Sequence, residues 1–187
     1  YYAMELVEGR SLGDVVTEMK AVADEPENGN GPLGTTTHGR EHFLRLAEMV
    51  AGVAEALHAA HERMDAEGRP APVFHRDVTP QNVMVSYWGA VKLTDFGLAR
   101  AMDRSSITKP GFVKGKLAYL APELTYEENP SAQSDVFSVG VVLWEVLAGE
   151  KLFKNKDPLK LMGTIRGMEM SWERSFIGST VIWYCLT

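Results

Sequence analysis

The sequence predicts an α+β fold that is mainly helical and contains one small β-hairpin. Apolar side chains recur at steps of three and four over residues 40–61, which places one apolar stripe along a helix. An apolar run over residues 135–148 is typical of a second, more deeply buried helix. Two short runs, Val83-Met84-Val85 and Val91-Lys92-Leu93, flank Tyr87-Trp88-Gly89 and predict the hairpin.

The region before the first long helix is less regular. Residues 1–7 form an apolar, aromatic run, which predicts a buried strand that leaves into a connector at residues 8–10. We expect a short helix to start at Ser11 and to continue through Met19. Residues 24–39 are rich in Gly, Pro, Asn and Thr and poor in apolar side chains, so they predict a mobile surface insertion.

The second half alternates short apolar runs with polar segments. A polar connector over residues 63–72 leads to the short run Val73-Phe74. The polar residues 100–116 predict a long loop, of a length that is usually functional or disordered. Residues 168–187 show no periodicity, and they stay unassigned.

The net charge, the cysteine count and the length of the apolar runs limit which partners and which cellular compartment the sequence favours. The net charge is −6, and no stretch is dense in Lys or Arg, so we expect no nucleic-acid partner. Cys185 is the only cysteine, which excludes an intramolecular disulfide and a cysteine-based metal site and favours a reducing, cytoplasmic setting. The longest apolar run is shorter than the roughly 20 residues that span a bilayer, so no membrane segment is expected within these residues.

Two motifs that contain aspartate supply the candidate catalytic and metal-binding residues. The stretch His75-Arg76-Asp77-Val78-Thr79-Pro80-Gln81-Asn82 is followed thirteen positions later by Asp95-Phe96-Gly97. Phosphoryl transfer needs a divalent ion held by oxygen ligands and a carboxylate that orients the attacking hydroxyl. Asp77, Asn82 and Asp95 supply these groups. Taken singly, each aspartate is more often a turn residue, and their joint spacing is what favours a site.

These motifs resemble those of the protein kinase family, in its bacterial Ser/Thr type. The first looks like the catalytic loop (75–82), the second like the metal-binding triplet, and Ala121-Pro122-Glu123 like the end of an activation segment over residues 95–123. Residues 4–9 are similar to the hinge between the two lobes. The resemblance covers residues 1–167 and implies a partial kinase domain, in which the large lobe is present and the small β-rich lobe is absent.

The resemblance implies a role for each matching residue. Asp77 would orient the substrate hydroxyl, and Asn82 and Asp95 would hold Mg²⁺, with Mn²⁺ as an alternative. The nucleotide would be ATP and the partner a protein substrate. The ATP-contacting residues would be Met4, the carbonyl of Glu5, the N–H of Val7, Met84 below the adenine and Ser11 at the ribose. The structural residues would be His75 packed with Phe96 and Gly97, Glu123, and Asp135 as the anchor of the catalytic loop.

Two positions depart from the family pattern. Kinases acting on Ser/Thr usually carry Lys two residues after the catalytic Asp, where this chain has Thr79. They usually carry Thr after the glycine that precedes Ala-Pro-Glu, where this chain has Lys116. We therefore expect Lys116 to reach Asp77 or the γ-phosphate from the opposite wall, with Thr79 accepting.

Several residues have simpler interpretations that stay open. Ser105, Ser106 and Thr108 could be phosphorylated and then pair with Arg76, or they could be solvated loop residues. Asp135 could be a helix N-terminal cap. His58 and His61 could bind the last carbonyls of their helix.

The sequence also lacks parts of the family pattern. No Gly-rich loop precedes the hinge, and no Val-Ala-x-Lys strand or partner glutamate is present, so we expect this chain alone to bind ATP poorly and to transfer little phosphate. The arginine that usually pairs with Glu123 is not recognisable. The alternative function is a non-catalytic, kinase-like scaffold or regulatory module. A small-molecule kinase is a third interpretation, although it should lack the Ala-Pro-Glu segment.

Overall fold

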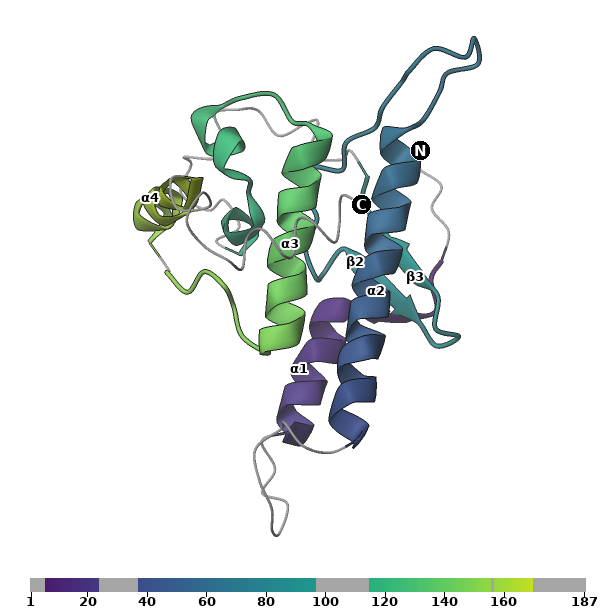
Figure 1. Cartoon of the computed structure of the whole chain (residues 1–187), viewed down its shortest axis with the longest axis vertical. Helices are drawn as coiled ribbons and strands as arrows, with labels where there is room; N and C mark the ends of the chain where they lie inside the picture. Colours follow the sequence, from purple (N-terminus) through teal and green to yellow (C-terminus); the bar gives the residue numbers. More distant parts are fainter. Residues whose placement is uncertain (1–5, 24–36, 97–114, 156, 170–187) are drawn as a thin grey trace.

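The structure is a computed structural model that describes residues 6–23, 37–96, 115–155 and 157–169 (Figure 1). These residues form an α+β fold that is mainly helical, as the sequence predicts. In chain order, the elements are β1 (Gly9–Ser11), α1 (Leu12–Ala23), α2 (Thr37–His61), β2 (Val83–Ser86), β3 (Val91–Leu93), the 3-10 turns η3 (Lys116–Tyr119) and η4 (Pro122–Tyr126), α3 (Ala132–Ala148) and α4 (Pro158–Glu169).

The predicted hairpin of β2 and β3 is confirmed, and β1 joins it to form a three-stranded sheet. β2 and β3 pair antiparallel with Met84 opposite Lys92, and Gly89 makes the turn at a φ of +85°. β1 pairs with the other edge of β2, where a Cβ on Gly9 would lie 2.2 Å from the carbonyl oxygen of Val85. Glycine at this position therefore allows the close approach of the two backbones.

The prediction of a buried strand over residues 1–7 is wrong for residues 6 and 7, which are the part of this range that the structure describes. Residues 6–8 are not in a strand, and Leu6 is 84% exposed. Residues 1–5 lie outside the described residues. The residues expected to be a connector carry the strand instead, because their backbone groups pair with β2.

The first two helices differ from the prediction at their ends. α1 extends to Ala23, beyond the expected end at Met19, and Ser11 caps it because the Asp14 N–H donates to the Ser11 hydroxyl. α2 begins at Thr37, so the last three residues of the expected insertion are helical. Residues 24–36 of that insertion lie outside the described residues. The apolar stripe of α2 is confirmed by its buried residues Leu46, Val50, Val53 and Leu57.

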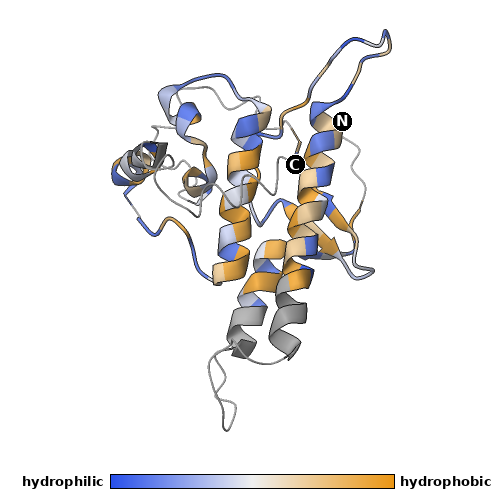
Figure 2. Ribbon diagram, in the orientation of Figure 1, coloured by the Kyte–Doolittle hydropathy of each residue, from blue (hydrophilic) through white to orange (hydrophobic). Residues whose placement is uncertain are grey.

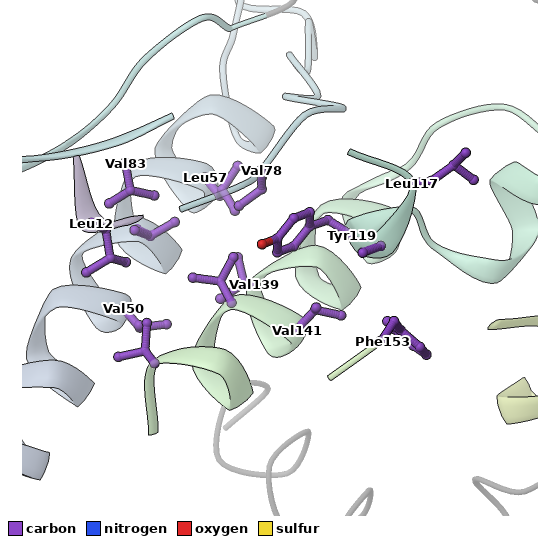
Figure 3. Packing of buried hydrophobic residues seen from close by; sticks show 14 of the residues in the cluster. Leu12, Val50, Leu57, Val78, Val83, Leu117, Tyr119, Val139, Val141 and Phe153 are labelled. Carbon is purple, nitrogen blue, oxygen red and sulfur yellow. The ribbon is translucent and has the colours of Figure 1, made fainter. Parts of the chain in front are cut away.

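α3 is the central helix of the core. It begins at Ala132, three residues before the expected start, because Ser131 and Ser134 form a capping box. Val139 and Val142 of α3 pack in one buried cluster with residues of α2, the hairpin and η3 (Figure 3). Apolar residues dominate this middle region in Figure 2, whereas the loop that leaves α2 is mostly hydrophilic.

α4 was not predicted from the sequence. Its buried contacts come from Leu161 and Ile165, and Asp157 caps it by accepting the N–H of Leu159. Two glycines, Gly163 and Gly167, interrupt the apolar pattern that would have indicated a helix. The short apolar run Val73-Phe74 has no regular secondary structure. Within the described segments, every helix is too short or too polar to cross a membrane.

Candidate active site

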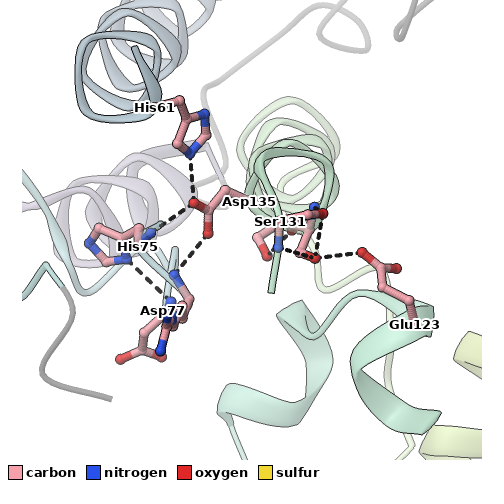
Figure 4. A network of polar contacts seen from close by, with 9 residues as sticks. His61, His75, Asp77, Glu123, Ser131 and Asp135 are labelled. Carbon is pink, nitrogen blue, oxygen red and sulfur yellow. Dashed lines mark hydrogen bonds and ion pairs between the residues drawn. The ribbon is translucent and has the colours of Figure 1, made fainter. Parts of the chain in front are cut away.

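Asp135 fixes the backbone of the motif at residues 75–82. Its carboxylate accepts the N–H of His75 at Oδ2 and the N–H of Arg76 at Oδ1, both at 2.8 Å (Figure 4). Arg76 has a φ of 69°, an unfavourable conformation for a side chain of this size. The two hydrogen bonds hold the chain in this conformation, and Asp135 is an internal residue of α3 rather than its cap.

His61 is a part of this network that sequence reasoning missed. Its Nε2 lies 2.8 Å from Oδ2 of Asp135, 74 positions away in the chain, instead of meeting the last carbonyls of α2. Its ring also lies against Phe74, with centroids 5.6 Å apart. No local signal in the sequence indicates such a contact, because the distance along the chain is so large.

His75 is a packed, neutral histidine. Burial lowers the pKa of its imidazole, and the ring sits edge-on to Phe96 with centroids 4.6 Å apart. Nε2 lies 2.8 Å from the carbonyl of Thr94 and must donate to it, whereas Nδ1 accepts the N–H of Asp77 at 3.2 Å. A protonated ring could still donate from Nε2 but would lose the acceptor at Nδ1, so the two bonds exist together only in the neutral form.

Asn82 connects the two acidic motifs. Its Nδ2 donates to the carbonyl of Asp77 at 2.7 Å and to Oδ2 of Asp77 at 3.0 Å. Its own carbonyl accepts the N–H of Thr94 at 2.8 Å and the hydroxyl of Thr94 at 3.0 Å. Asp95 follows Thr94 directly, with a φ of 64°. Asn82 therefore joins Asp77 to the backbone directly before Asp95, and the three residues mark one rim of the site.

The donor set at this rim fits a magnesium ion that is shared with phosphate. Because the amide nitrogen of Asn82 is used by Asp77, its Oδ1 is the atom that remains for a cation, and Asp95 adds a carboxylate. In the described parts of the chain, no three His, Cys, Asp or Glu residues gather into a complete metal site. Mg²⁺ commonly uses one or two protein carboxylates and completes its shell with phosphate and water.

Lys116 reaches Asp77 from the opposite side. Its Nζ donates to Oδ2 of Asp77, and the side chains are 38% and 15% exposed. Thr79 is buried, and its carbonyl accepts the N–H of Asn82 at 3.0 Å. Asp77, Thr79 and Lys116 line one pocket together with the apolar side chains of Leu120 and Leu124.

The expected nucleotide-contacting residues are only partly described. Ser11 lies directly opposite Met84 in the β1–β2 pairing, so the two share one end of the small sheet. The hydroxyl of Ser11 donates to Asp14 at 2.7 Å, a capping contact that the sequence did not reveal. Val7 is partly buried, whereas Met4 and Glu5 lie outside the described residues.

Of the residues expected to have a regulatory or structural role, some lie outside the described residues, whereas Arg76 lies within them. Gly97, Ser105, Ser106 and Thr108 lie outside the described residues. Nε of Arg76 is buried and has no hydrogen-bond partner among the described residues.

Glu123 and the segment after it are held by two helices. Glu123 accepts a hydrogen bond of 2.6 Å from Ser134 of α3. Arg166 of α4 donates from Nε to the Thr125 hydroxyl at 2.9 Å and covers the ring of Tyr126 at 4.4 Å. The η4 turn is therefore fixed to α3 and α4.

Comparison with known proteins agrees with the family resemblance of the sequence motifs. A family model described as the protein kinase domain matches residues 1–178, past the residue 167 at which the sequence resemblance ended. The serine/threonine-protein kinase PknB of Mycobacterium leprae is 35% identical over 162 residues, which are 86% of this chain and 22% of that protein.

Two further relatives are similar at the same level. The probable serine/threonine-protein kinase pknA2 of Bifidobacterium longum is 37% identical over 118 residues, 62% of this chain and 16% of that protein. The tyrosine-protein kinase MasK of Myxococcus xanthus is 35% identical over 129 residues, 67% of this chain and 20% of that protein. The aligned part spans about a fifth of the length of these curated relatives.

Proposed function

The chain belongs to the protein kinase domain family, and from this premise we propose that it is part of an ATP-dependent protein kinase that phosphorylates serine and threonine. The observation that carries the proposal is the arrangement around Asp77. Its Oδ2 is shared by Asn82 and Lys116, which leaves Oδ1 as the oxygen that would accept the hydrogen of a substrate hydroxyl.

Asn82 and Asp95 would hold Mg²⁺, or Mn²⁺ in its place. The ion would neutralise the charge that develops on the transferred phosphate. The protein's part would be to fix these two ligands, and the hydrogen bonds that Thr94 donates to the backbone carbonyl of Asn82 support this role.

Lys116 would supply the positive charge that the family usually places two residues after the catalytic aspartate. Its contact with Asp77 supports this role, because a lysine at this place can reach both the carboxylate and a phosphate oxygen bound beside it. Thr79 would line the pocket at the position that the lysine usually takes.

ATP would bind along the edge of the small sheet. Met4, Glu5 and Val7 would meet the adenine, Met84 would lie below it, and Ser11 would approach the ribose. The β1–β2 pairing supports the last two assignments, because it places Ser11 and Met84 side by side. Phosphorylation of Ser105, Ser106 or Thr108 would give the buried Nε of Arg76 an anionic partner.

Serine and threonine are the proposed acceptors because Pro80 follows Thr79, as in the Ser/Thr pattern, and because two of the three relatives above carry that name. The single cysteine supports a reducing, cytoplasmic location. The 187 residues carry no Gly-rich loop before the hinge and no Lys–Glu pair, so by themselves they should transfer phosphate slowly or not at all.

Phosphate transfer from labelled ATP to a mixed protein substrate tests the proposal, followed by phosphoamino-acid analysis. The full polypeptide that the gene encodes should label serine and threonine, and Asp77→Asn should abolish the labelling. Label on tyrosine would overturn the proposed specificity. Equal labelling by Asp77→Asn would overturn the proposed site, and steady turnover by the 187 residues alone would overturn their proposed inactivity.

A further inference from the structure

We propose that the apolar run at residues 181–186 packs on an exposed apolar stripe of α3, within the same chain. The α3 stripe consists of Phe137, Gly140, Trp144 and Leu147. These residues follow one another at steps of three, four and three, so they lie on one face of the helix. The inference goes beyond the proposed function and does not depend on it.

The α3 stripe lies on the side of the helix opposite the core. Val139 and Val142 are buried, whereas Trp144 and Leu147 are each 39% exposed. Among the described residues, no atom lies within 4 Å of a Cβ built on Gly140, so there is open space beside the middle of the stripe. Two large apolar side chains next to open space form a surface on which another apolar group can pack.

The run at residues 181–186 is the most apolar part of the chain after α4. Its sequence is Val181-Ile182-Trp183-Tyr184-Cys185-Leu186, and no charged residue follows Arg174. It lies beyond residue 178, where the match to the family model ends. An unbroken apolar run of this kind is unfavourable in water and favours aggregation, so a surface that covers it stabilises the folded chain. Its two aromatic rings suit the exposed indole of Trp144.

The size of the α3 stripe favours a segment of the same chain over a second copy. An aromatic side chain has about 150–250 Å² of surface, so the exposed 39% of Trp144 amounts to about 100 Å² or less. A stable interface between two proteins buries about 800 Å² on each partner. The stripe is too small for such an interface, whereas a segment of the same chain binds at a high effective concentration and needs less contact area.

The chain between α4 and the run is long enough to bring the run to α3. α4 ends at Glu169 (Figure 1), and residues 170–180 separate it from the run. An extended chain spans at most about 3.3–3.6 Å per residue, so residues 170–180 can cover up to roughly 40 Å. α3 has 17 residues and is therefore about 26 Å long. Because Arg166 near the end of α4 contacts η4, and η4 is bound to α3, the stripe lies within reach.

Cys185 reports on this contact, because it is the only cysteine of the 187-residue chain and lies inside the run. The measurement is the rate at which its thiol reacts with dithionitrobenzoate. In the folded chain this rate should be at least tenfold lower than in urea, and Trp144→Glu should raise it at least tenfold, because a carboxylate in the stripe repels an apolar partner. The matched control is Trp88→Glu in the β2–β3 turn, where Trp88 is 85% exposed, and it should leave the rate unchanged.

Disulfide cross-linking gives a second measurement that does not depend on disrupting the stripe. Gly140→Cys places a thiol in open space, and Leu147→Cys places one about two turns further along the same face. Oxidised glutathione is the oxidant, and mass spectrometry of the digested protein identifies the bond to Cys185. At least one of these variants should form it at least tenfold faster than the control Trp88→Cys, because the bond requires Cα atoms within about 7 Å of each other.

Three results, in protein that remains folded by circular dichroism, would overturn the proposal. The first is a Cys185 thiol that reacts as fast in the folded chain as in urea, or at a rate that Trp144→Glu leaves unchanged. The second is cross-linking of Cys185 to position 88 as fast as to positions 140 and 147. The third is a disulfide from the stripe to Cys185 that joins two chains, which would assign the stripe to a second copy.

Discussion

The carboxylate of Asp135 accepts the backbone N–H of Arg76 at 2.8 Å, across 59 positions of the chain. The same carboxylate accepts the N–H of His75 and meets the ring of His61. One buried acid thus organises a helix end and the loop that carries Asp77. Because this contact joins the backbone of the loop to α3, its contribution to the fold can be measured through stability.

Asp135→Ala should lower the free energy of unfolding by about 3 kcal/mol or more, since it leaves one buried and one partly buried backbone donor without partners. Asp157→Ala is the matched control, because Asp157 caps α4 in an exposed position and should cost about 1 kcal/mol. Urea unfolding followed by circular dichroism measures both. Equal losses in the two variants would contradict the anchoring role.

Stability should depend on pH through His75. Burial lowers the pKa of His75 below its unfolded value of 6.5, so near and below pH 6.5 the unfolded chain takes up a proton that the folded chain does not. The free energy of unfolding should therefore fall as the pH drops from about 7.5 through 6.5, and this contribution should be absent at higher pH. His75→Gln keeps a donor for the Thr94 carbonyl and cannot be protonated.

Unfolding curves at a series of pH values give the comparison. The wild type should lose more stability than His75→Gln between pH 7.5 and 5.5, whatever the difference in their absolute stabilities. Parallel pH profiles for the two proteins would show that His75 is not held in its neutral form by the fold.

The backbone contact between Gly9 and Val85 predicts opposite effects for two glycine substitutions. Gly9→Ala places a Cβ against the Val85 carbonyl and should cost about 1–3 kcal/mol of unfolding free energy. Gly163→Ala, within α4, meets no atom within 4 Å and should stabilise by about 0.5–1 kcal/mol. A Gly9→Ala protein as stable as the wild type would show that β1 does not pair with β2.

The sequence predicts those features whose cause is local. The spacing of Leu46, Val50, Val53 and Leu57 defines α2, because it reflects the helix period itself. Asn82 and Asp95 flank a predicted hairpin, and the two ends of a hairpin must meet, so their proximity follows from the pattern. The contact between Lys116 and Asp77 was expected from the family resemblance and from the chemistry of the exchanged residues.

Other features depend on contacts that no local pattern contains. The bonds from His61 to Asp135 and from Tyr119 to Glu145 join residues 74 and 26 positions apart. β1 is only three residues long, and its backbone can approach β2 because Gly9 has no side chain. In the sequence, the same glycine indicates a connector and not a strand. The early start of α3 shows that a capping residue, rather than the first apolar residue, can define where a helix begins.

We propose that Lys116 takes the place of the catalytic-loop lysine, and kcat for phosphate transfer by Lys116→Ala beside Asp77→Asn tests this exchange most directly. We predict that Asp77→Asn abolishes transfer and that Lys116→Ala lowers kcat by about 100-fold, as expected when a cation that stabilises developing charge is removed. If Lys116→Ala retains the wild-type kcat while Asp77→Asn is inactive, the exchange of roles between positions 79 and 116 is wrong.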